Sequence, residues 1–260
     1  LTNDLEKPHP KEIKFVLTAV LNFFEKYKLK SGLEIKTKSE FSAKVGLGSS
    51  SAVAVSTIKG LAELSGIEIT DKELFDLSYK TVLDIQDVGS GFDVAAAIYG
   101  GTLYFVTGGK IIEPLKTENM PLLVGYTGIK ADTATLVKIV GRKLKKEPKK
   151  YNEIFNQSQE IVNLAKTEMK KSNWQKVGEL MNLNQDLLRK LGVSSKELEN
   201  LIKAALDSGA YGAKLSGAGG GDCMVAMTPM ARQDDVKTAI GKAGGTIVEV
   251  KVQAEGVKIE

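Results

Sequence analysis

The residues most able to do chemistry form a glycine- and serine-rich stretch at residues 46–51 (GLGSSS), which runs into an apolar helical pattern ending near Leu64. Glycine lets a backbone approach a ligand closely because it has no Cβ. The first turn of the following helix offers backbone N–H groups and the positive end of the helix dipole, and both favour phosphate. The serine hydroxyls add donors for phosphate oxygens or a ligand for Mg²⁺. The stretch therefore predicts a cradle for the phosphates of a nucleotide.

Taken alone, this stretch also fits an ordinary turn before a helix that Ser49 or Ser50 caps. It is not a Walker A loop, because no Lys-Ser or Lys-Thr pair follows the last glycine. It is not the dinucleotide fingerprint either, because Ser51 stands where that motif has its third glycine.

Two further glycine loops decide between these interpretations. The run GSGFD at residues 89–93 places one carboxylate, Asp93, just after a flexible turn and before a helix of small residues. Asp at such a position is commonly a cap, but here Ser90 can be the cap, and the helix dipole would keep Asp93 ionised. The run SGAGGGD at residues 216–222 is too glycine-rich for a simple hairpin. It also stands between apolar segments, which argues against a flexible linker.

Composition limits the classes of function. Of 260 residues, 42% are hydrophobic and 26% are charged, as in a globular protein, and no apolar run is long enough to cross a bilayer. The N-terminal residues are not a secretion signal. His9 is the single histidine and Cys223 the single cysteine, which disfavours histidine catalysis, zinc sites and disulfides and fits a reducing cytoplasm. The net charge of +4 suits an anionic small molecule better than nucleic acid.

Periodicity and turn residues predict an α+β chain of two domains, residues 1–118 and 119–260, the first with the ATP-binding loop. We expect helices over residues 10–28, 52–64, 70–83 (with a Thr70–Glu73 capping box), most of 133–208 with a break at 143–150, and 234–243. We expect strands over residues 33–38, 102–106, 111–112, 121–126, 223–227 and 246–252, with Gly108 and Gly109 at a hairpin turn.

With three glycine loops in this order, one carboxylate and almost no histidine, the chain resembles the GHMP kinase superfamily from about residue 33 to its C-terminus. The resemblance implies a two-domain GHMP kinase fold. Its N-terminal domain would be ribosomal protein S5 domain 2-like, and its C-terminal domain would be a ferredoxin-like α/β-sandwich. Nothing in residues 1–32 looks like the opening strands of the family, so we expect a fold that lacks them.

Within the superfamily the chain is most similar in sequence to the phosphomevalonate kinases. The similarity lies in residues 44–50, 89–97, 124–137 and 216–223. This implies ATP-dependent phosphorylation of 5-phosphomevalonate to 5-diphosphomevalonate. Mevalonate kinase or another GHMP small-molecule kinase, such as homoserine kinase, stays open as an alternative. A catalytically silent nucleotide-binding module is the alternative from another class. A nucleic-acid-binding domain is a third, against which the low basicity and the third loop argue.

The resemblance also implies site residues. Asp93 is the candidate base, with Lys44 beside it as the best of three candidate cations, the others being Lys130 and Lys214. ATP and Mg²⁺ would be the cofactors, with Ser50 reaching the metal. The residues assigned to the nucleotide are Gly46, Leu47, Gly48, Ser49, Ser50, Ser51, Gly217, Ala218, Gly219 and Gly220. Those assigned to the substrate are Ser90, Gly91, Lys130, Thr133 and Ser216, with Thr127 and Thr135 as further donors.

Two points depend on the acceptor and the metal. A phosphate acceptor is mostly a dianion at neutral pH because its second pKa is about 6, so Asp93 would then orient the substrate more than it removes a proton. Asp84 and Asp87 are candidates for a second metal ligand. We expect a small-molecule substrate, no nucleic acid, no membrane and a cytoplasmic location, and a homodimer is left open.

Overall fold

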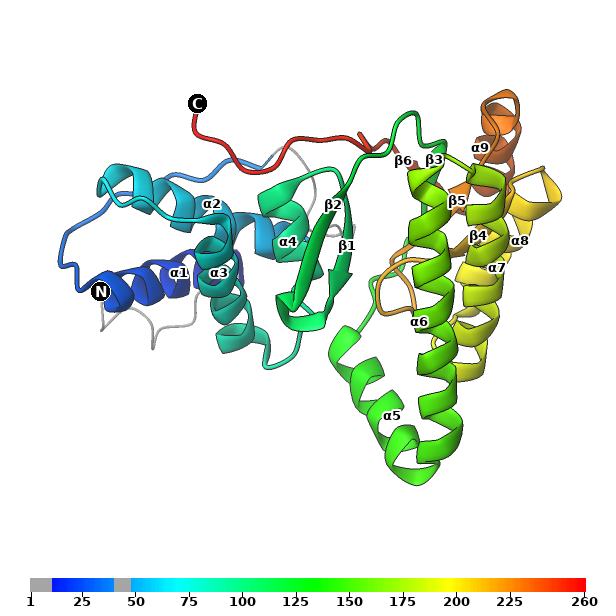
Figure 1. Cartoon of the computed structure of the whole chain (residues 1–260), viewed down its shortest axis with the longest axis horizontal. Helices are drawn as coiled ribbons and strands as arrows, with labels where there is room; N and C mark the ends of the chain where they lie inside the picture. Colours follow the sequence, from blue (N-terminus) through cyan, green and yellow to red (C-terminus); the bar gives the residue numbers. More distant parts are fainter. Residues whose placement is uncertain (1–10, 40–47) are drawn as a thin grey trace. The chain divides into compact units, whose positions relative to one another are not determined.

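The structure, a computed structural model, describes residues 11–39 and 48–260 (Figure 1). The described residues form two compact units. The first comprises the residues up to Leu115 together with Gln253–Glu260, and the second comprises Lys116–Val252. The domain boundary that the sequence predicts between residues 118 and 119 stays a prediction. No helix in the described part of the chain is long and apolar enough to cross a membrane.

The first unit packs four helices with a two-stranded hairpin. The helices are α1 (Lys11–Tyr27), α2 (Ser49–Leu64), α3 (Asp71–Gln86) and α4 (Phe92–Tyr99), and the antiparallel hairpin is β1 (Thr102–Val106) and β2 (Ile111–Leu115). Each helix turns its apolar stripe inward, so Phe15, Phe23, Ile58, Leu74 and Phe75 are buried in one core. Burying each such side chain contributes roughly 1.5–3 kcal/mol, which holds α2 and α4 in fixed positions.

Local sequence signals explain the ends of these elements. Thr70 accepts a hydrogen bond from the Glu73 N–H, and Glu73 accepts one from the Thr70 N–H, so the predicted capping box begins α3. The hairpin turns at Thr107–Gly109, where Gly108 and Gly109 have φ of +78° and +70°. Gly109 also lies against the Phe75 ring, because a Cβ there would stand 2.3 Å from a ring carbon. The predicted hairpin is therefore confirmed.

The C-terminal segment of the chain packs with the first unit. The Gly101 N–H donates to Ala254 O over 2.8 Å, and the Val257 N–H donates to Ala97 O over 2.9 Å. A Cβ on Gly100 would stand 2.4 Å from Ala254 O, so only a glycine lets the two backbones approach this closely. The segment thus fixes the C-terminal end of α4.

The second unit is a four-stranded antiparallel sheet covered by helices. Its strands are β3 (Leu122–Tyr126), β4 (Gly212–Leu215), β5 (Cys223–Met227) and β6 (Thr246–Val248), in the order β4-β5-β3-β6. Its helices are α5 (Thr133–Lys146), α6 (Pro148–Lys170), α7 (Trp174–Leu191), α8 (Lys196–Asp207) and α9 (Gln233–Lys242), with a short 3-10 turn, η3 (Met230–Arg232). In Figure 1 the long helices α6 and α7 run side by side within this unit.

The order of elements in this unit is strand, helices, two strands, helix, strand, and that order with this sheet is ferredoxin-like. Leu215, Met224 and Ala226 point from the sheet into a core with Leu198, Leu201, Ile202 and Ile240 of the helices. The α+β chain with a ferredoxin-like second unit that the sequence predicts is confirmed.

Four predicted details are wrong. Residues 33–38 are irregular and mostly exposed, because no described strand pairs with them. The helical break around Pro148 is confined to Glu147, since proline is tolerated at the first position of α6. The third glycine loop is a hairpin connection after all, because it joins the neighbouring antiparallel strands β4 and β5. The β6 strand ends at Val248, short of the predicted 252.

Candidate active site

The phosphate cradle that the sequence predicts falls at the start of α2. Gly48 is the residue before the helix, with a left-handed φ of +75°, and its carbonyl accepts the first helical hydrogen bond, from Ala52. Among the described residues no side chain caps this helix, so capping by Ser49 or Ser50 is not what the structure shows. The N–H groups of Ser49, Ser50 and Ser51 belong to the first turn, which has no intrahelical acceptors. They are placed to donate to an anion.

Asp93 lies directly against this cradle. A Cβ on Gly48 would stand 3.2 Å from Asp93 Cβ, 3.3 Å from its Cγ and 3.4 Å from Oδ1. Helices α2 and α3 lie between the two loops in the sequence, so the fold of the first unit brings the loops together. A carboxylate thus stands beside the positive end of α2.

Burial controls the charge of Asp93. It raises the pKa of the Asp93 carboxyl from 3.8 to about 6. The expectation that the helix dipole keeps this group ionised is therefore incomplete, because the loss of water around the carboxylate favours its protonated form. A carboxyl with a pKa near neutrality is suited to accept a proton from a substrate and to release it again.

The second glycine loop, residues 89–91, is fixed by hydrogen bonds from α3 and from the β1–β2 turn. Tyr79 donates its hydroxyl to Gly89 O over 2.7 Å, and the Gly108 N–H donates to Ser90 O over 2.9 Å. Gly91, with φ of +88°, is the residue before α4, so Ser90 is not the cap, although its hydroxyl lies 3.4 Å from the Phe92 N–H. A Cβ on Gly91 would press on the rings of Phe75 and Tyr79 at 3.1 Å. These contacts fix the direction in which Asp93 leaves α4.

The third glycine loop, Ser216–Asp222, lies in the second unit and has one clamped half and one open half. Gly220 donates its N–H to Val193 O over 2.7 Å, and Asp222 donates its N–H to Ile129 O over 2.7 Å. The carbonyl of Asp222 accepts hydrogen bonds from the N–H and the hydroxyl of Thr127, both at 2.9 Å. A Cβ on Gly217, by contrast, would meet nothing within 4 Å. The open half, residues 216–218, is therefore the part that a ligand can approach.

The predicted cations and donors stand in different places. Lys44, Gly46 and Leu47 lie outside the described residues. Lys214 is on β4, where its ammonium donates to Leu215 O over 2.6 Å, and burial lowers its pKa to about 8. Lys130 and Thr133 are exposed at the start of α5. The Ala131 N–H between them donates to Asp222 Oδ1 over 3.2 Å, which ties this segment to the third loop.

No protein cluster for a metal forms in residues 11–39 or 48–260, because they contain no group of three histidine, cysteine or acidic side chains that could hold one. Asp84, one candidate ligand, accepts hydrogen bonds from Asn22 and Lys80, at 2.9 and 2.8 Å. Burial opposes its ionisation, but these bonds outweigh it and lower its pKa. Asp87, the other candidate, ends α3 with a positive φ of 60°. A hard cation bound mainly through nucleotide phosphates fits this donor set better.

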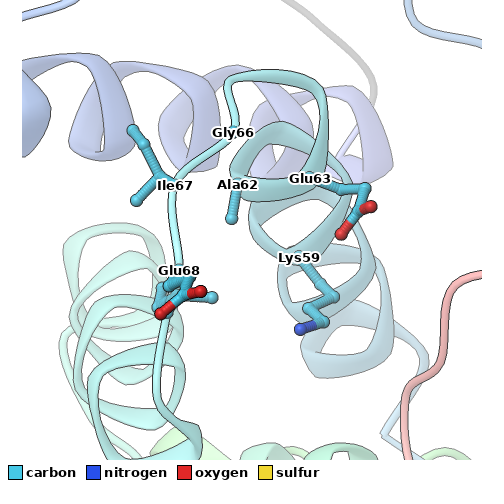
Figure 2. Close-up of a pocket in the computed structure, with 7 residues that line it drawn as sticks. Lys59, Ala62, Glu63, Gly66, Ile67 and Glu68 are labelled. Carbon is cyan, nitrogen blue, oxygen red and sulfur yellow. The ribbon is translucent and has the colours of Figure 1, made fainter.

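A shallow pocket of about 360 Å³ opens at the opposite end of α2 (Figure 2). Lys59 and Glu63 lie on its helix side, and Glu68 lies on the loop that leads to α3. At about 1.5 Å per residue the pocket is about 20 Å along α2 from Gly48. It is thus separate from the phosphate cradle.

Comparison with known proteins agrees with this geometry. The model of the GHMP kinases N terminal domain matches residues 14–101, which contain the cradle and Asp93, and the model of the GHMP kinases C terminal domain matches residues 165–246, which contain the third loop. The chain belongs to the GHMP kinase family. Members of this kinase family transfer a phosphoryl group from ATP, so the two loops of the first unit are the expected place for its phosphates.

Relatives of this GHMP kinase narrow the assignment. The curated mevalonate kinase of Pyrococcus horikoshii is 38% identical over 253 residues, which cover 95% of this chain and 75% of the relative. Among solved structures, L. major mevalonate kinase in complex with R-mevalonate has a TM-score of 0.74 and 26% identity, covering 92% of this chain and 76% of that one. Streptococcus pneumoniae phosphomevalonate kinase, with a TM-score of 0.76, 21% identity and coverage of 94% and 82%, shows the shared fold.

The expectation of a phosphomevalonate kinase is therefore wrong. Curated relatives with 37–39% identity over most of the chain are mevalonate kinases. The physical reason is that the glycine loops are interpreted from the sequence as phosphate-binding, and both kinds of kinase transfer a phosphoryl group from ATP. The sequences of these loops therefore carry little information about the acceptor.

Some functional contacts were missed from the sequence. Asp222 and Tyr79 anchor the third and the second glycine loop, and neither was singled out. Asp222 directly follows the glycine run, and that position was a usable signal. Tyr79 lies ten residues before the carbonyl that it binds, on the preceding helix, and no local pattern marks it.

Proposed function

We propose that this GHMP kinase is a mevalonate kinase, which transfers the γ-phosphoryl group of ATP to an alcohol oxygen of mevalonate. The identity to curated mevalonate kinases over most of the chain supports the acceptor. The observation that carries the chemistry is the placement of the half-buried Asp93 carboxyl against Gly48 at the start of α2.

An alcohol acceptor gives Asp93 a definite task. The hydroxyl must lose its proton as its oxygen bonds to phosphorus, and Asp93 accepts that proton on a carboxylate oxygen. The pKa of about 6 leaves this carboxyl mostly ionised at neutral pH and still basic enough to accept a proton. The orienting role considered for a phosphate acceptor is thereby replaced by a role as general base.

The rest of the cradle supplies position and charge. The N–H groups of Ser49, Ser50 and Ser51 would bind phosphate oxygens at the positive end of α2. The Ser50 hydroxyl would contribute to holding Mg²⁺, which neutralises phosphate charge when bound. In the second unit, the open half of the third loop would offer the N–H groups of Gly217 and Ala218 to a phosphate, because the Ser216 N–H already donates to Cys223 O over 2.9 Å. Phosphoryl transfer needs such positioning more than covalent help.

Three acceptors separate the alternatives in one assay. ADP release is followed with ATP, Mg²⁺ and either mevalonate, phosphomevalonate or homoserine. We expect turnover with mevalonate and a kcat/KM at least about tenfold lower with the others, because one group absent from a fitted site costs about 1–3 kcal/mol. Preference for homoserine would assign another GHMP small-molecule activity. ATP binding without turnover on any acceptor would overturn the proposal in favour of a silent nucleotide-binding module.

The cellular setting is part of the same proposal. A cytoplasmic enzyme fits the single cysteine, which is buried on β5. A small-molecule substrate fits the solved L. major mevalonate kinase, whose structure is a complex with R-mevalonate. Whether the chain forms a homodimer is a prediction that sedimentation of the purified protein would test.

A further inference from the structure

Gln185 is a buried amide that connects the two supports of the third glycine loop. Its side chain is 0% exposed on α7. Its Oε1 accepts the Leu215 N–H over 2.9 Å, at the residue that precedes the loop. Its Nε2 donates to Ser194 Oγ over 3.0 Å and to Glu199 Oε1 over 2.9 Å. One side chain thus joins the end of β4 to the connection between α7 and α8.

That connection is the segment on which the middle of the loop rests. Val193 O accepts the Gly220 N–H over 2.7 Å, and a Cβ on Gly219 would stand 2.1 Å from the same oxygen. Val193 directly precedes Ser194, the first partner of Gln185. The position of Val193 O therefore depends on the bonds of its neighbour.

The carboxylate of Glu199 accepts hydrogen bonds from both Gln185 and Ser194. Glu199 accepts hydrogen bonds from Ser194 Oγ over 2.5 Å and from Arg189 at 2.8 to 3.0 Å. Burial opposes the ionisation of Glu199, but the hydrogen bonds from Arg189, Ser194 and Gln185 outweigh it, and its pKa is lowered. Charge-assisted bonds of this kind are stronger and shorter than neutral ones, so they define one geometry.

From these contacts we infer that Gln185 is a positioning residue for phosphoryl transfer. It sets the spacing between Leu215, where the third loop begins, and Val193, on which its clamped half rests. With both supports fixed, the N–H groups of Gly217 and Ala218 in the open half are held in one direction, while the Ser216 N–H donates to Cys223 O over 2.9 Å. This role rests on the proposed kinase activity of the loop, and Gln185 itself touches no substrate.

The chain offers a matched control on the same helix. Asn182 accepts the Ala213 N–H over 3.0 Å and donates to Tyr211 O over 3.2 Å, so it bonds to the same strand edge in the same way. Its bonds lie toward the start of β4, away from the loop, and none of them reaches the α7–α8 connection. Removing either amide costs similar hydrogen bonds, but only Gln185 lies between the supports of the loop.

Gln185→Met and Asn182→Leu are compared with the wild type in mevalonate-dependent ADP release. For Gln185→Met we expect kcat to fall about tenfold to a hundredfold, because displacing a positioning loop by about 1 Å lowers the rate by up to about a hundredfold. Its KM values for ATP and mevalonate should change less than about threefold, since the lost contacts act in the transition state. Asn182→Leu should keep kcat within about twofold, although both variants lose stability.

Amide hydrogen exchange of residues 216–222 gives a second readout that needs no acceptor. Exchange should accelerate in Gln185→Met and stay at the wild-type rate in Asn182→Leu. Equal exchange in the two variants, or an unchanged kcat in Gln185→Met, would overturn the inference. If the wild type fails to use mevalonate, the proposed function fails while the exchange comparison still decides the inference. Should Gln185→Met not fold, Ser194→Ala cuts one link and should shift both readouts in the same direction.

Discussion

At the scale of single residues, the proposed function depends on a carboxyl placed where its charge is costly. Asp93 is half-buried against Gly48, and the fold could hold a neutral side chain there at lower free energy. The neighbouring helix start offers partial positive charge, but burial still raises the pKa. Such a conflict between stability and charge is common where a residue is retained for chemistry.

Substituting Asp93→Asn should stabilise the protein at neutral pH. Because the folded-state pKa of Asp93, about 6, lies above the value of 3.8, its favourable contribution is complete below about pH 4 and is lost as pH rises through about 6. Asparagine does not ionise, so the variant loses no stability over this pH range. The difference in free energy of unfolding, variant minus wild type, should therefore rise by about 3 kcal/mol at most between about pH 4 and pH 7. Denaturant unfolding at both pH values measures it, and a difference independent of pH would contradict the burial of the charge.

Gly48→Ala should impair the cradle. An alanine at this position would have to keep the left-handed φ of +75°, which strains its backbone. Its Cβ would also stand 3.2 Å from Asp93 Cβ. Shifting the carboxyl by a few tenths of an ångström should lower kcat/KM for mevalonate by about tenfold. Gly60→Ala is the control, because its Cβ would meet nothing within 4 Å in the middle of the same helix. It should be neutral or slightly stabilising, and an equal loss of activity in both variants would argue against a specific contact.

At the scale of elements, the sequence predicts what short-range contacts decide. The capping box of α3, the Gly108–Gly109 hairpin and strand β5 depend on residues close together in the chain, and all three are confirmed. Strand β4 was missed, because Gly212–Leu215 contains no β-branched residue. It is a strand because β5 pairs with it and because Asn182 and Gln185 bond to its free edge, 30 or so residues away in sequence.

In the candidate site, too, local sequence patterns predict some features, and others depend on contacts between distant residues. Gly48, Ser50 and Asp93 were found from local patterns, since a glycine turn before a helix carries its own signal. The contacts that fix these loops, from Tyr79 to Gly89 and from Thr127 to Asp222, join elements that only the folded chain brings together. The acceptor could not be predicted, because the glycine motifs describe the phosphate that every such kinase handles.

Two glycines of the third loop should respond differently to alanine. Both Gly217 and Gly219 have a left-handed φ, of +77° and +86°, which costs about 1–2 kcal/mol for any L side chain. A Cβ on Gly219 would also stand 2.1 Å from Val193 O, whereas one on Gly217 meets open space. Gly219→Ala should therefore lower the midpoint of thermal unfolding more than Gly217→Ala. Equal midpoints would show that the loop is not clamped at Val193.

At the scale of the whole molecule, the two compact units are not two successive halves of the chain. The segment from Gln253 onward returns to the first unit after the second is complete. Its contact with α4, through Gly100 and Gly101, adds long-range order to the unit that carries Asp93. The segment therefore supports the unit that carries Asp93, although the two are remote in sequence.

Removing residues 254–260 should destabilise the first unit. The truncation deletes two backbone hydrogen bonds, to Ala254 O and from the Val257 N–H, and exposes the backbone of Gly100. At about 0.5–1.5 kcal/mol for each bond, the free energy of unfolding should fall by about 1–3 kcal/mol. Removing only the exposed residues 259 and 260 should change it by less than about 0.5 kcal/mol. Chemical denaturation of both truncated forms checks this, and equal stability would show that the segment is not a structural part of the unit.

The most direct test of the account is the pH dependence of mevalonate phosphorylation by the wild type and by Asp93→Asn. We predict that wild-type kcat/KM falls as pH drops through about 6, where the Asp93 carboxyl takes up its proton. The variant should be slower by about 10²- to 10⁴-fold and should lack this titration. A variant that keeps wild-type activity with mevalonate, or the same acidic limb in both proteins, would contradict the assignment of Asp93 as the base.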